Sequence, residues 1–302
     1  MMKKILAIDG GGMKGIYAAS LLTEVEKHCG GHICDYFDML VGTSTGAIIA
    51  AALAIKIPAE KILDLYLEKG KDIFPKERWK LFRGRYNTQP LKNELVKIFK
   101  DKRMSDANTR LLIPTYNLST DAVQVFKTPH AEDLRFDKER KIYDILLATT
   151  AAPVYFSPYK MKGGVYMDGG VGANNPSLIG LVEGVTRCKW NKDEIMILNI
   201  GSVTGGRNTT GQERMGLLHF LTVQQCFMNA ESQYATNICK LIIGKRYMRI
   251  EEMVKPGEVT LDRVDATSLK KLKDLGIRSV QQNYDYISEN LLSDKIESVD
   301  FH

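Results

Sequence analysis

The strongest constraint on the fold is a unit that occurs twice near the start of the chain, an apolar run followed by a glycine-rich turn and a helical pattern. In the first unit Ile5 to Ile8 precedes Asp9 to Gly12, and in the second Phe37 to Val41 precedes Gly42 to Gly46. A buried strand, a turn and a helix together form the unit from which parallel sheets are built. We therefore expect a mainly parallel sheet.

The rest of the chain continues this alternation and then changes character. Further strands are predicted around residues 111–114, 122–126, 165–167 and 194–200, and helices cover most of the segments between them. Residues 202–216 are rich in Gly, Thr, Asn and Arg, which indicates a connection, and a long helical pattern follows from Met215 to Ile243. We predict an α/β core over residues 1–201, with helices on both faces of the sheet, and a C-terminal helical extension over residues 202–302 packed on it.

Composition excludes several classes of protein. A formal net charge of +6 favours an anionic membrane surface but is too small for a dedicated nucleic-acid binder, so no nucleic acid polymer is expected as a partner. The 5 cysteines show no Cys-x-x-Cys spacing, which argues against a disulfide framework and a zinc site. No apolar run approaches the roughly 20 residues of a membrane span, and the N-terminal run is too short for a signal peptide. A cytoplasmic protein is expected.

The segment Gly42-Thr43-Ser44-Thr45-Gly46 matches the nucleophile-elbow pattern Gly-x-Ser-x-Gly between a strand and a helix. A sharp turn there lifts the serine hydroxyl clear of the sheet, and the following helix N-terminus favours developing negative charge. Ser44 is therefore the candidate nucleophile, with Thr45 beside it as an auxiliary residue. The alternative is a tight glycine turn with a capping serine.

Asp168 is the best candidate for the base that a serine nucleophile needs. It ends a predicted strand and precedes Gly169-Gly170, so it is expected at the edge of the sheet from which Ser44 also emerges. No histidine follows the acid at a position typical of a triad: His130 precedes Asp168, and His219 lies within a helical pattern. A dyad without histidine is expected. The alternative is an aspartate that only starts a turn.

The glycine-rich segment Asp9 to Gly15 also satisfies Gly-x-Gly-x-x-Gly, the dinucleotide-binding fingerprint. Two features argue against a dinucleotide site. The negatively charged carboxylate of Asp9 would lie beside the pyrophosphate, and the second strand ends in the serine motif instead of an acidic residue. Successive glycine amides at a helix N-terminus suit an oxyanion hole, and we assign that role to Gly10, Gly11 and Gly12. Lys14 is an auxiliary candidate that adds positive charge near the oxyanion or a lipid phosphate, or else a helix-surface lysine.

These motifs, in this order, resemble the patatin-like phospholipase family over roughly residues 4–201. Ala151-Ala152-Pro153 and Ala173-Asn174-Asn175-Pro176 also resemble the family's segments around its catalytic aspartate. The resemblance implies a three-layer α/β/α fold, a dyad of Ser44 and Asp168, an oxyanion hole from Gly10 to Gly12, and hydrolysis of lipid acyl esters without a metal or other cofactor. Lys14 stands where the family more often has arginine, so a bidentate anion contact is not expected there.

The same resemblance extends to biological setting, because similar compact bacterial members include effectors activated by cyclic nucleotides in anti-phage defence. We therefore expect membrane phospholipid as substrate, peripheral contact with the inner membrane and a cyclic-nucleotide activator. Its site would lie in the C-terminal extension or at an oligomer interface. The basic and aromatic segment Lys76 to Tyr86 is expected to help docking. The helix from Met215 to Ile243 either covers the active site, forms the face of a homo-oligomer or packs in the core. An unspecific esterase, a dinucleotide-binding protein and a non-catalytic lipid-binding module are the alternatives.

Overall fold

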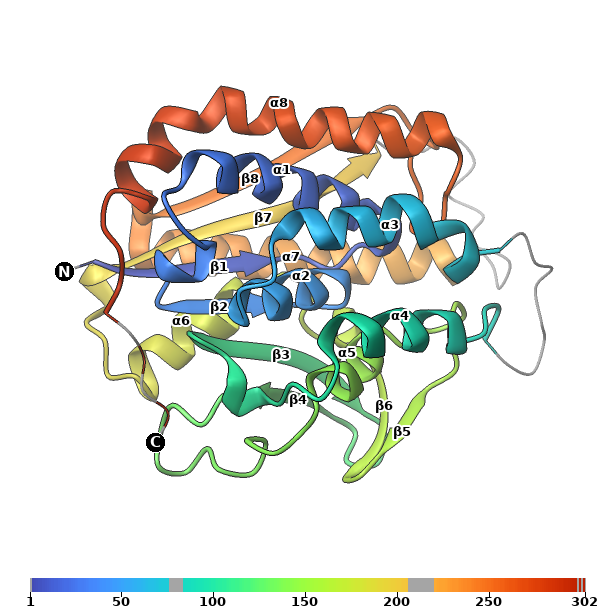
Figure 1. The fold of residues 1–302 in the computed structure, drawn as a ribbon, viewed down its shortest axis with the longest axis horizontal. Helices are drawn as coiled ribbons and strands as arrows, with labels where there is room; N and C mark the ends of the chain where they lie inside the picture. Colours follow the sequence, from blue (N-terminus) through green and yellow to red (C-terminus); the bar gives the residue numbers. More distant parts are fainter. Residues whose placement is uncertain (1, 76–83, 206–219, 298, 300, 302) are drawn as a thin grey trace.

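The computed structural model describes residues 2–75, 84–205, 220–297, 299 and 301. These residues form one sheet of eight strands (Figure 1). Seven of the strands follow the order β5-β6-β3-β2-β1-β7-β8, and the eighth, β4, pairs with the edge of β3 opposite to the one that β2 and β6 share. The strands are β1 (Lys3–Ile8), β2 (Met39–Gly42), β3 (Arg110–Asn117), β4 (Ala122–Lys127), β5 (Tyr159–Met161), β6 (Gly164–Asp168), β7 (Ile195–Gly205) and β8 (Tyr247–Val254).

Five neighbouring strands of the sheet, β3, β2, β1, β7 and β8, run parallel to one another. β4 and β6 run antiparallel to β3, and β5 runs antiparallel to β6. The predicted mainly parallel sheet is thus confirmed. β1 and β2 are buried almost throughout, as expected for strands covered on both faces, and this explains why they are continuous apolar runs in the sequence.

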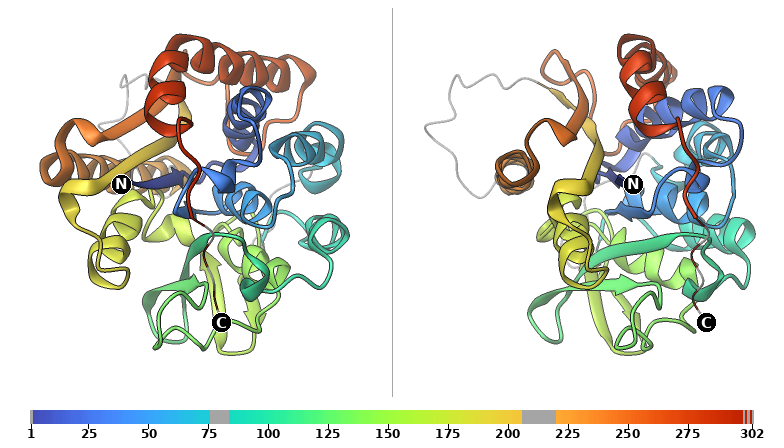
Figure 2. Two further views of the ribbon diagram at one scale, coloured as in Figure 1. Left: turned by 60° about the vertical axis from the view of Figure 1, so that its left-hand side comes forward. Right: turned by 90° about the vertical axis from the view of Figure 1, so that its left-hand side faces the viewer.

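Helices cover both faces of the sheet, which gives the three-layer α/β/α architecture (Figure 2). One face carries α1 (Gly15–His28), α2 (Thr45–Ala54), α3 (Ala59–Ile73), α4 (Gln89–Phe99), α5 (Ile142–Thr149) and α8 (Ala266–Leu291), and the other carries α6 (Ser177–Thr186) and α7 (Phe220–Ile243). Short 3-10 turns are η1 (Gly12–Lys14), η2 (Ile33–Asp35), η3 (Met104–Asp106), η4 (Gly169–Val171), η5 (Lys192–Glu194) and η8 (Gly244–Arg246).

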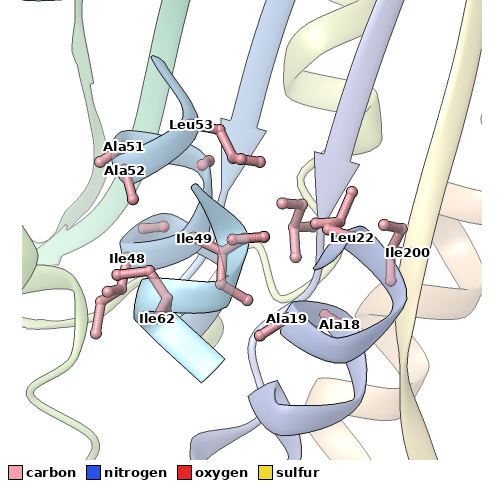
Figure 3. Close-up of a cluster of buried hydrophobic side chains, with 14 of the residues drawn as sticks. Ala18, Ala19, Leu22, Ile48, Ile49, Ala51, Ala52, Leu53, Ile62 and Ile200 are labelled. Carbon is pink, nitrogen blue, oxygen red and sulfur yellow. The ribbon is translucent and has the colours of Figure 1, made fainter. Parts of the chain in front are cut away.

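The main core lies between the sheet and the helices α1, α2 and α3. Every residue of α2 is buried, which explains its alanine-rich sequence, because small side chains let the helix lie close to the sheet and to both neighbouring helices. In Figure 3, Ile48 and Ile49 of α2 lie near Ile62 of α3, and Leu22 of α1 lies near Ile200 of β7. This packing fixes the start of α2, where Ser44 lies.

The segment after residue 201 differs in one respect from the helical extension we expected. β7 continues to Gly205, past the predicted boundary, and β8 then adds a further parallel strand to the sheet. Helix α8 packs along α1, where the Tyr17 hydroxyl lies 2.9 Å from Ser279 Oγ and Ser20 Oγ donates to the Lys273 carbonyl at 2.8 Å. The C-terminal segment therefore completes the sheet and one of its helical layers. Among the described residues, no helix has the length and apolarity needed to cross a membrane.

Candidate active site

Ser44 occupies a sharp turn between β2 and α2. Its backbone angles are φ 54° and ψ −123°, an unusual conformation for a residue with a side chain and typical of strained functional turns. The flanking glycines have no space for a side chain: a Cβ on Gly42 would lie 2.3 Å from the Gly46 carbonyl oxygen, and one on Gly46 would lie 2.3 Å from the Ile8 carbonyl oxygen. The Ser44 amide donates to Thr149 Oγ1 at 3.1 Å. The predicted nucleophile-elbow geometry is present.

Sheet topology brings Asp168 to this turn. At Leu112, β3 pairs with β2 on one edge and with β4 on the other. At Thr115, β3 still pairs with β4, but Asp168 of β6 now takes the edge that β2 has left. β2 and β6 therefore approach each other end to end along the same edge of β3. Ser44 Oγ donates a hydrogen bond to Asp168 Oδ2 at 2.6 Å.

Asp168 is 5% exposed, and its carboxylate is held from two sides. Besides the bond from Ser44, Oδ1 accepts a hydrogen bond from the Gly170 amide at 2.7 Å. Burial raises the pKa of Asp168 from 3.8 to about 6, although both hydrogen bonds favour the charged form and oppose the rise. A carboxylate with such a pKa is a stronger base than an exposed one and is still ionised above neutral pH.

The glycine loop after β1 lies beside Ser44. Gly12 has φ +57°, and a Cβ on it would lie 2.3 Å from the Leu261 carbonyl oxygen, so only glycine fits there. The Leu261 carbonyl accepts a hydrogen bond from the Met13 amide at 2.7 Å, and the Gly10 amide donates one to the Asn174 carbonyl at 3.2 Å. The Gly11 and Gly12 amides make no hydrogen bond to any other described residue. These two amides are therefore available to a ligand, whereas the Gly10 amide holds the loop in place.

A narrow pocket joins the serine, the aspartate and the glycine loop, and it has room for only about 50 Å³ of water-sized molecules. This is enough for one or two waters and far below the volume of an acyl chain. Apart from the polar groups already described, the lining is mostly aromatic and aliphatic. Its outer side is formed by Gln224 and Met228 of α7, by Leu261 after β8, and by aromatic side chains that include Tyr155 and Phe156. In this structure the pocket is therefore too narrow for an acyl chain.

The two auxiliary candidates lie differently from each other. Thr45 lines the pocket, and its buried Oγ1 has no hydrogen-bond partner among the described residues. Lys14 lies on the far side of the glycine loop, where Nζ donates to the Val203 carbonyl at 3.0 Å, and burial lowers the pKa of Lys14 to about 8. Thr149 is a further residue of the site, not predicted from sequence: it accepts a hydrogen bond from the Ser44 amide and donates one to the Pro114 carbonyl at 2.7 Å. No local motif marks that threonine.

No histidine lines the pocket within the part of the chain that the structure describes. His130 lies elsewhere, with Nδ1 2.9 Å from Thr128 Oγ1 and Nε2 3.0 Å from Glu183 Oε1. His219 is outside the described residues, as are residues 76–83 of the predicted docking segment and residues 215–219 at the start of the predicted long helix.

Comparisons with known proteins agree with the fold and identify the family. A model of the family "Patatin-like phospholipase" matches residues 6–180. A "cGAMP-activated phospholipase" of Pseudomonas aeruginosa is 32% identical over 92% of this chain and 88% of its own length, and one of Vibrio cholerae is 32% identical over 90% and 89%. "Patatin-like protein 4" of Arabidopsis thaliana is 27% identical over 92% and 83%.

Among solved structures, VipD from Legionella pneumophila superposes with a TM-score of 0.50 at 14% identity, covering 94% of this chain and 67% of that protein, which supports the fold alone. Fold, family model and relatives together define the class, a lipid acyl hydrolase built on a three-layer α/β/α sheet. The chain belongs to the patatin-like phospholipase family. Membership of this family favours the acyl hydrolase over the dinucleotide-binding alternative. The structure agrees with this, because the carboxylate of Asp9 is buried and pairs with Arg249 at 2.8 Å.

Proposed function

We propose that this protein releases fatty acids from membrane phospholipids, with Ser44 as nucleophile and Asp168 as general base. The observation that carries the proposal is the hydrogen bond of 2.6 Å from Ser44 Oγ to Asp168 Oδ2, inside an apolar pocket and on a strained turn. Nucleophile and base must lie within about 2.6–3.2 Å for direct proton transfer. The pair meets that requirement before any substrate binds.

The reaction follows from this geometry. Ser44 Oγ attacks the ester carbonyl carbon while its proton passes to Asp168 Oδ2, and the negative charge on the carbonyl oxygen is stabilised by the Gly11 and Gly12 amides. The intermediate then expels the alcohol, a lysophospholipid, which takes the proton from Asp168 and leaves an acyl group on Ser44. In the second half, water gives a proton to Asp168 and attacks the acyl carbon. Fatty acid leaves, and the proton returns to Ser44.

Activity also requires the pocket to open, because about 50 Å³ does not admit an acyl chain. Relatives that are 32% identical over about nine tenths of this chain are named cGAMP-activated phospholipases. We propose that a cyclic nucleotide likewise activates this enzyme by displacing the residues that close the pocket. A phospholipase that is silent without its signal suits the anti-phage role that the sequence suggested.

Helix α7 supplies a surface for contact with the membrane. Phe227, Tyr234 and Leu241 recur at seven-residue intervals and are 68%, 70% and 85% exposed, with Ile238 beside them. They form one apolar stripe on α7. A different side of the same helix, with Gln224 and Met228, lines the catalytic pocket. We propose that this stripe, the α7 apolar stripe, enters the lipid interface and so brings the pocket to its substrate.

Phospholipase assays on liposomes with and without cGAMP test the proposal. Wild-type protein is expected to release fatty acid in the presence of cGAMP, and Ser44→Ala and Asp168→Asn are each expected to lose at least about 10³-fold in rate, because the two groups act as one unit. Ser293→Ala and Asp274→Asn, at exposed residues that do not line the pocket, serve as matched controls. Full activity in Ser44→Ala would falsify the assignment.

A further inference from the structure

A second cavity lies directly behind the glycine loop, between α7 and the carboxyl ends of β7 and β8. Its volume is about 530 Å³, within the range of roughly 300–1,000 Å³ that small-molecule sites occupy. The carboxyl edge of a parallel sheet is also where α/β proteins bind ligands. Unlike the catalytic pocket, this cavity is lined largely by polar and charged side chains, and the chemistry described above does not use it.

Two cationic side chains, Lys14 and Arg249, and two acidic ones, Asp9 and Glu251, line this polar cavity. Lys14 Nζ has one hydrogen bond, to the Val203 carbonyl, so two of its three N–H groups remain available among the described residues. Arg249 Nη2 lies 2.8 Å from Asp9 Oδ2 and 2.8 Å from Glu251 Oε2, which fixes its position at the base of the cavity. Lys14, held beneath the glycine loop with N–H groups unengaged among the described residues, suits a phosphodiester group, whereas Arg249 is already paired with Asp9, Glu251 and Asn199.

The opposite wall is a row of amide and hydroxyl groups on α7. Gln225, Asn229, Gln233 and Thr236 recur on one face of the helix, and Gln225 Nε2 donates to Asn229 Oδ1 at 2.8 Å. The row extends over about 16 Å, given a rise of about 1.5 Å per residue. Side-chain amides pair with the donor and acceptor edges of nucleobases. A wall of this length suits two bases better than one.

Two buried polar atoms at the base of the cavity have no partner among the described residues. They are Asn174 Oδ1, on a side chain that is 7% exposed, and Ser202 Oγ. Buried polar atoms are seldom left unpaired, because their desolvation is then uncompensated. Both side chains line the cavity, so a ligand with hydroxyl or amine donors there would satisfy them.

The polar cavity and the catalytic pocket share a wall. Gly11, Met228 and Leu261 line both of them. β7 carries one extra residue opposite β8 between Ile200 and Val203, and this bulge brings Ser202 under the glycine loop, where a Cβ on Gly11 would lie 2.7 Å from Ser202 Oγ. A ligand that spreads α7 from β8 would therefore displace the residues that close the catalytic pocket.

We infer that the polar cavity is the effector site of this enzyme and that it takes a cyclic dinucleotide. A phosphodiester lies toward Lys14, the bases lie along the α7 amides, and occupancy moves Met228 and Leu261 out of the catalytic pocket. The inference rests on the proposed cyclic-nucleotide activation and adds its location, which is within one chain and apart from the dyad.

Binding is tested on full-length Ser44→Ala protein, so that hydrolysis plays no part. Calorimetric titration with cGAMP is expected to give a dissociation constant that rises at least tenfold when Asn229→Leu or Gln233→Leu is added. Gln281→Leu, an exposed glutamine on α8 given the same substitution, is the matched control and is expected to stay within twofold.

Alkylation of native cysteines tests the same site without a cavity substitution. Cys226 lines the polar cavity, whereas Cys29 and Cys188 do not and serve as internal controls. Saturating cGAMP is expected to slow modification of Cys226 at least fivefold and to leave the other two unchanged, as measured by mass spectrometry.

The possible outcomes separate the inference from the proposed function. Tight binding that is indifferent to both α7 substitutions, or that leaves Cys226 unprotected, would overturn the site while the proposed activation stands. Absence of any binding would overturn both the site and the activation. Whether the chain hydrolyses phospholipid is decided independently by the liposome assay with wild-type protein.

Discussion

At Ser44 the backbone and the side chain are fixed by different parts of the chain. The turn is set by Gly42 and Gly46, which allow close approach to their neighbours, and by Thr149, which accepts the Ser44 amide. The hydroxyl is set by Asp168, more than a hundred residues later in the sequence. Such preorganisation holds the proposed nucleophile and base together without substrate, so little reorganisation would be needed in the transition state.

The pKa of Asp168 predicts how activity depends on pH. The base must be ionised, and its pKa is raised to about 6 by burial, so activity is present above this value and is lost as pH falls through it. We expect kcat/KM on a short soluble ester to fall about tenfold per pH unit below about 6. Return to pH 8 should restore activity, which excludes irreversible unfolding. A midpoint that moves when His130 is replaced by Gln would assign the base to a histidine instead.

Gly12 allows a prediction with a close internal control. Gly12→Ala would place a methyl group against the Leu261 carbonyl and distort an oxyanion donor, so we expect ester hydrolysis to fall by about 10²–10³-fold. Gly244 has nearly the same backbone angle, φ +60° against +57°, but has nothing within 4 Å of its Cβ direction. Gly244→Ala should cost only about 1–2 kcal/mol of stability and spare activity. Equal rates in the two variants would contradict the assigned loop.

Residues that form local patterns could be predicted from sequence, and residues that act through distant contacts could not. Ser44 follows one strand and Asp168 ends another, each within a recognisable glycine motif, and their side chains are in contact in the structure. Thr149 and Arg249 carry no such pattern, because their partners, Ser44 and Asp9, are brought to them only by the folded sheet. Lys14 was expected near the oxyanion or a lipid phosphate, but a loop of three glycines separates it from the pocket.

At the scale of elements, the interior strands and the edge strand β4 were predictable from sequence, whereas the edge strands β5 and β8 were not. β1 and β2 are continuous apolar runs because both of their faces are covered. β8 has Arg249, Glu251 and Glu252 within it and lies at the end of the sheet, so its sequence shows neither a continuous apolar run nor strict alternation. It was therefore included in a helical extension. The end-to-end approach of β6 and β2 likewise depends on pairing that no local pattern encodes.

Helix α7 has three sides with three environments, and its apolar stripe can be tested separately. Replacing Tyr234 and Leu241 with Ser should lower cGAMP-stimulated hydrolysis of liposomes at least tenfold while turnover of a short soluble ester changes less than twofold, because only the first substrate requires docking. Val182 and Val185, exposed apolar residues of α6, give a matched double substitution that should affect neither substrate.

The contrary results for the α7 apolar stripe are equally specific. A parallel loss with both substrates would show that the stripe supports the fold instead of contacting lipid. A concentration-dependent change in sedimentation that disappears in the double variant would assign the stripe to a homo-oligomer interface, the alternative considered for this helix.

At the scale of the whole molecule, the C-terminal segment cannot be separated from the catalytic sheet. β8 extends the sheet, and Gly276 of α8 lies so close to α1 that a Cβ on it would be 2.5 Å from the Tyr17 carbonyl oxygen. We expect Gly276→Ala to destabilise the entire protein by about 1–3 kcal/mol through overpacking, in a single thermal transition. Asp274→Ala, exposed on the same helix, should change stability by less than about 0.5 kcal/mol. Two separate transitions would show that the segment folds independently.

The central claim is that one buried pair, Ser44 and Asp168, performs the hydrolysis, and covalent labelling tests it most directly. After treatment with a small fluorophosphonate and digestion, mass spectrometry is expected to find the adduct on Ser44. Labelling should be absent in Ser44→Ala and at least about 10³-fold slower in Asp168→Asn, because the base is needed to activate the hydroxyl. An adduct on another residue, or labelling of Ser44 at an unchanged rate in Asp168→Asn, would contradict the account.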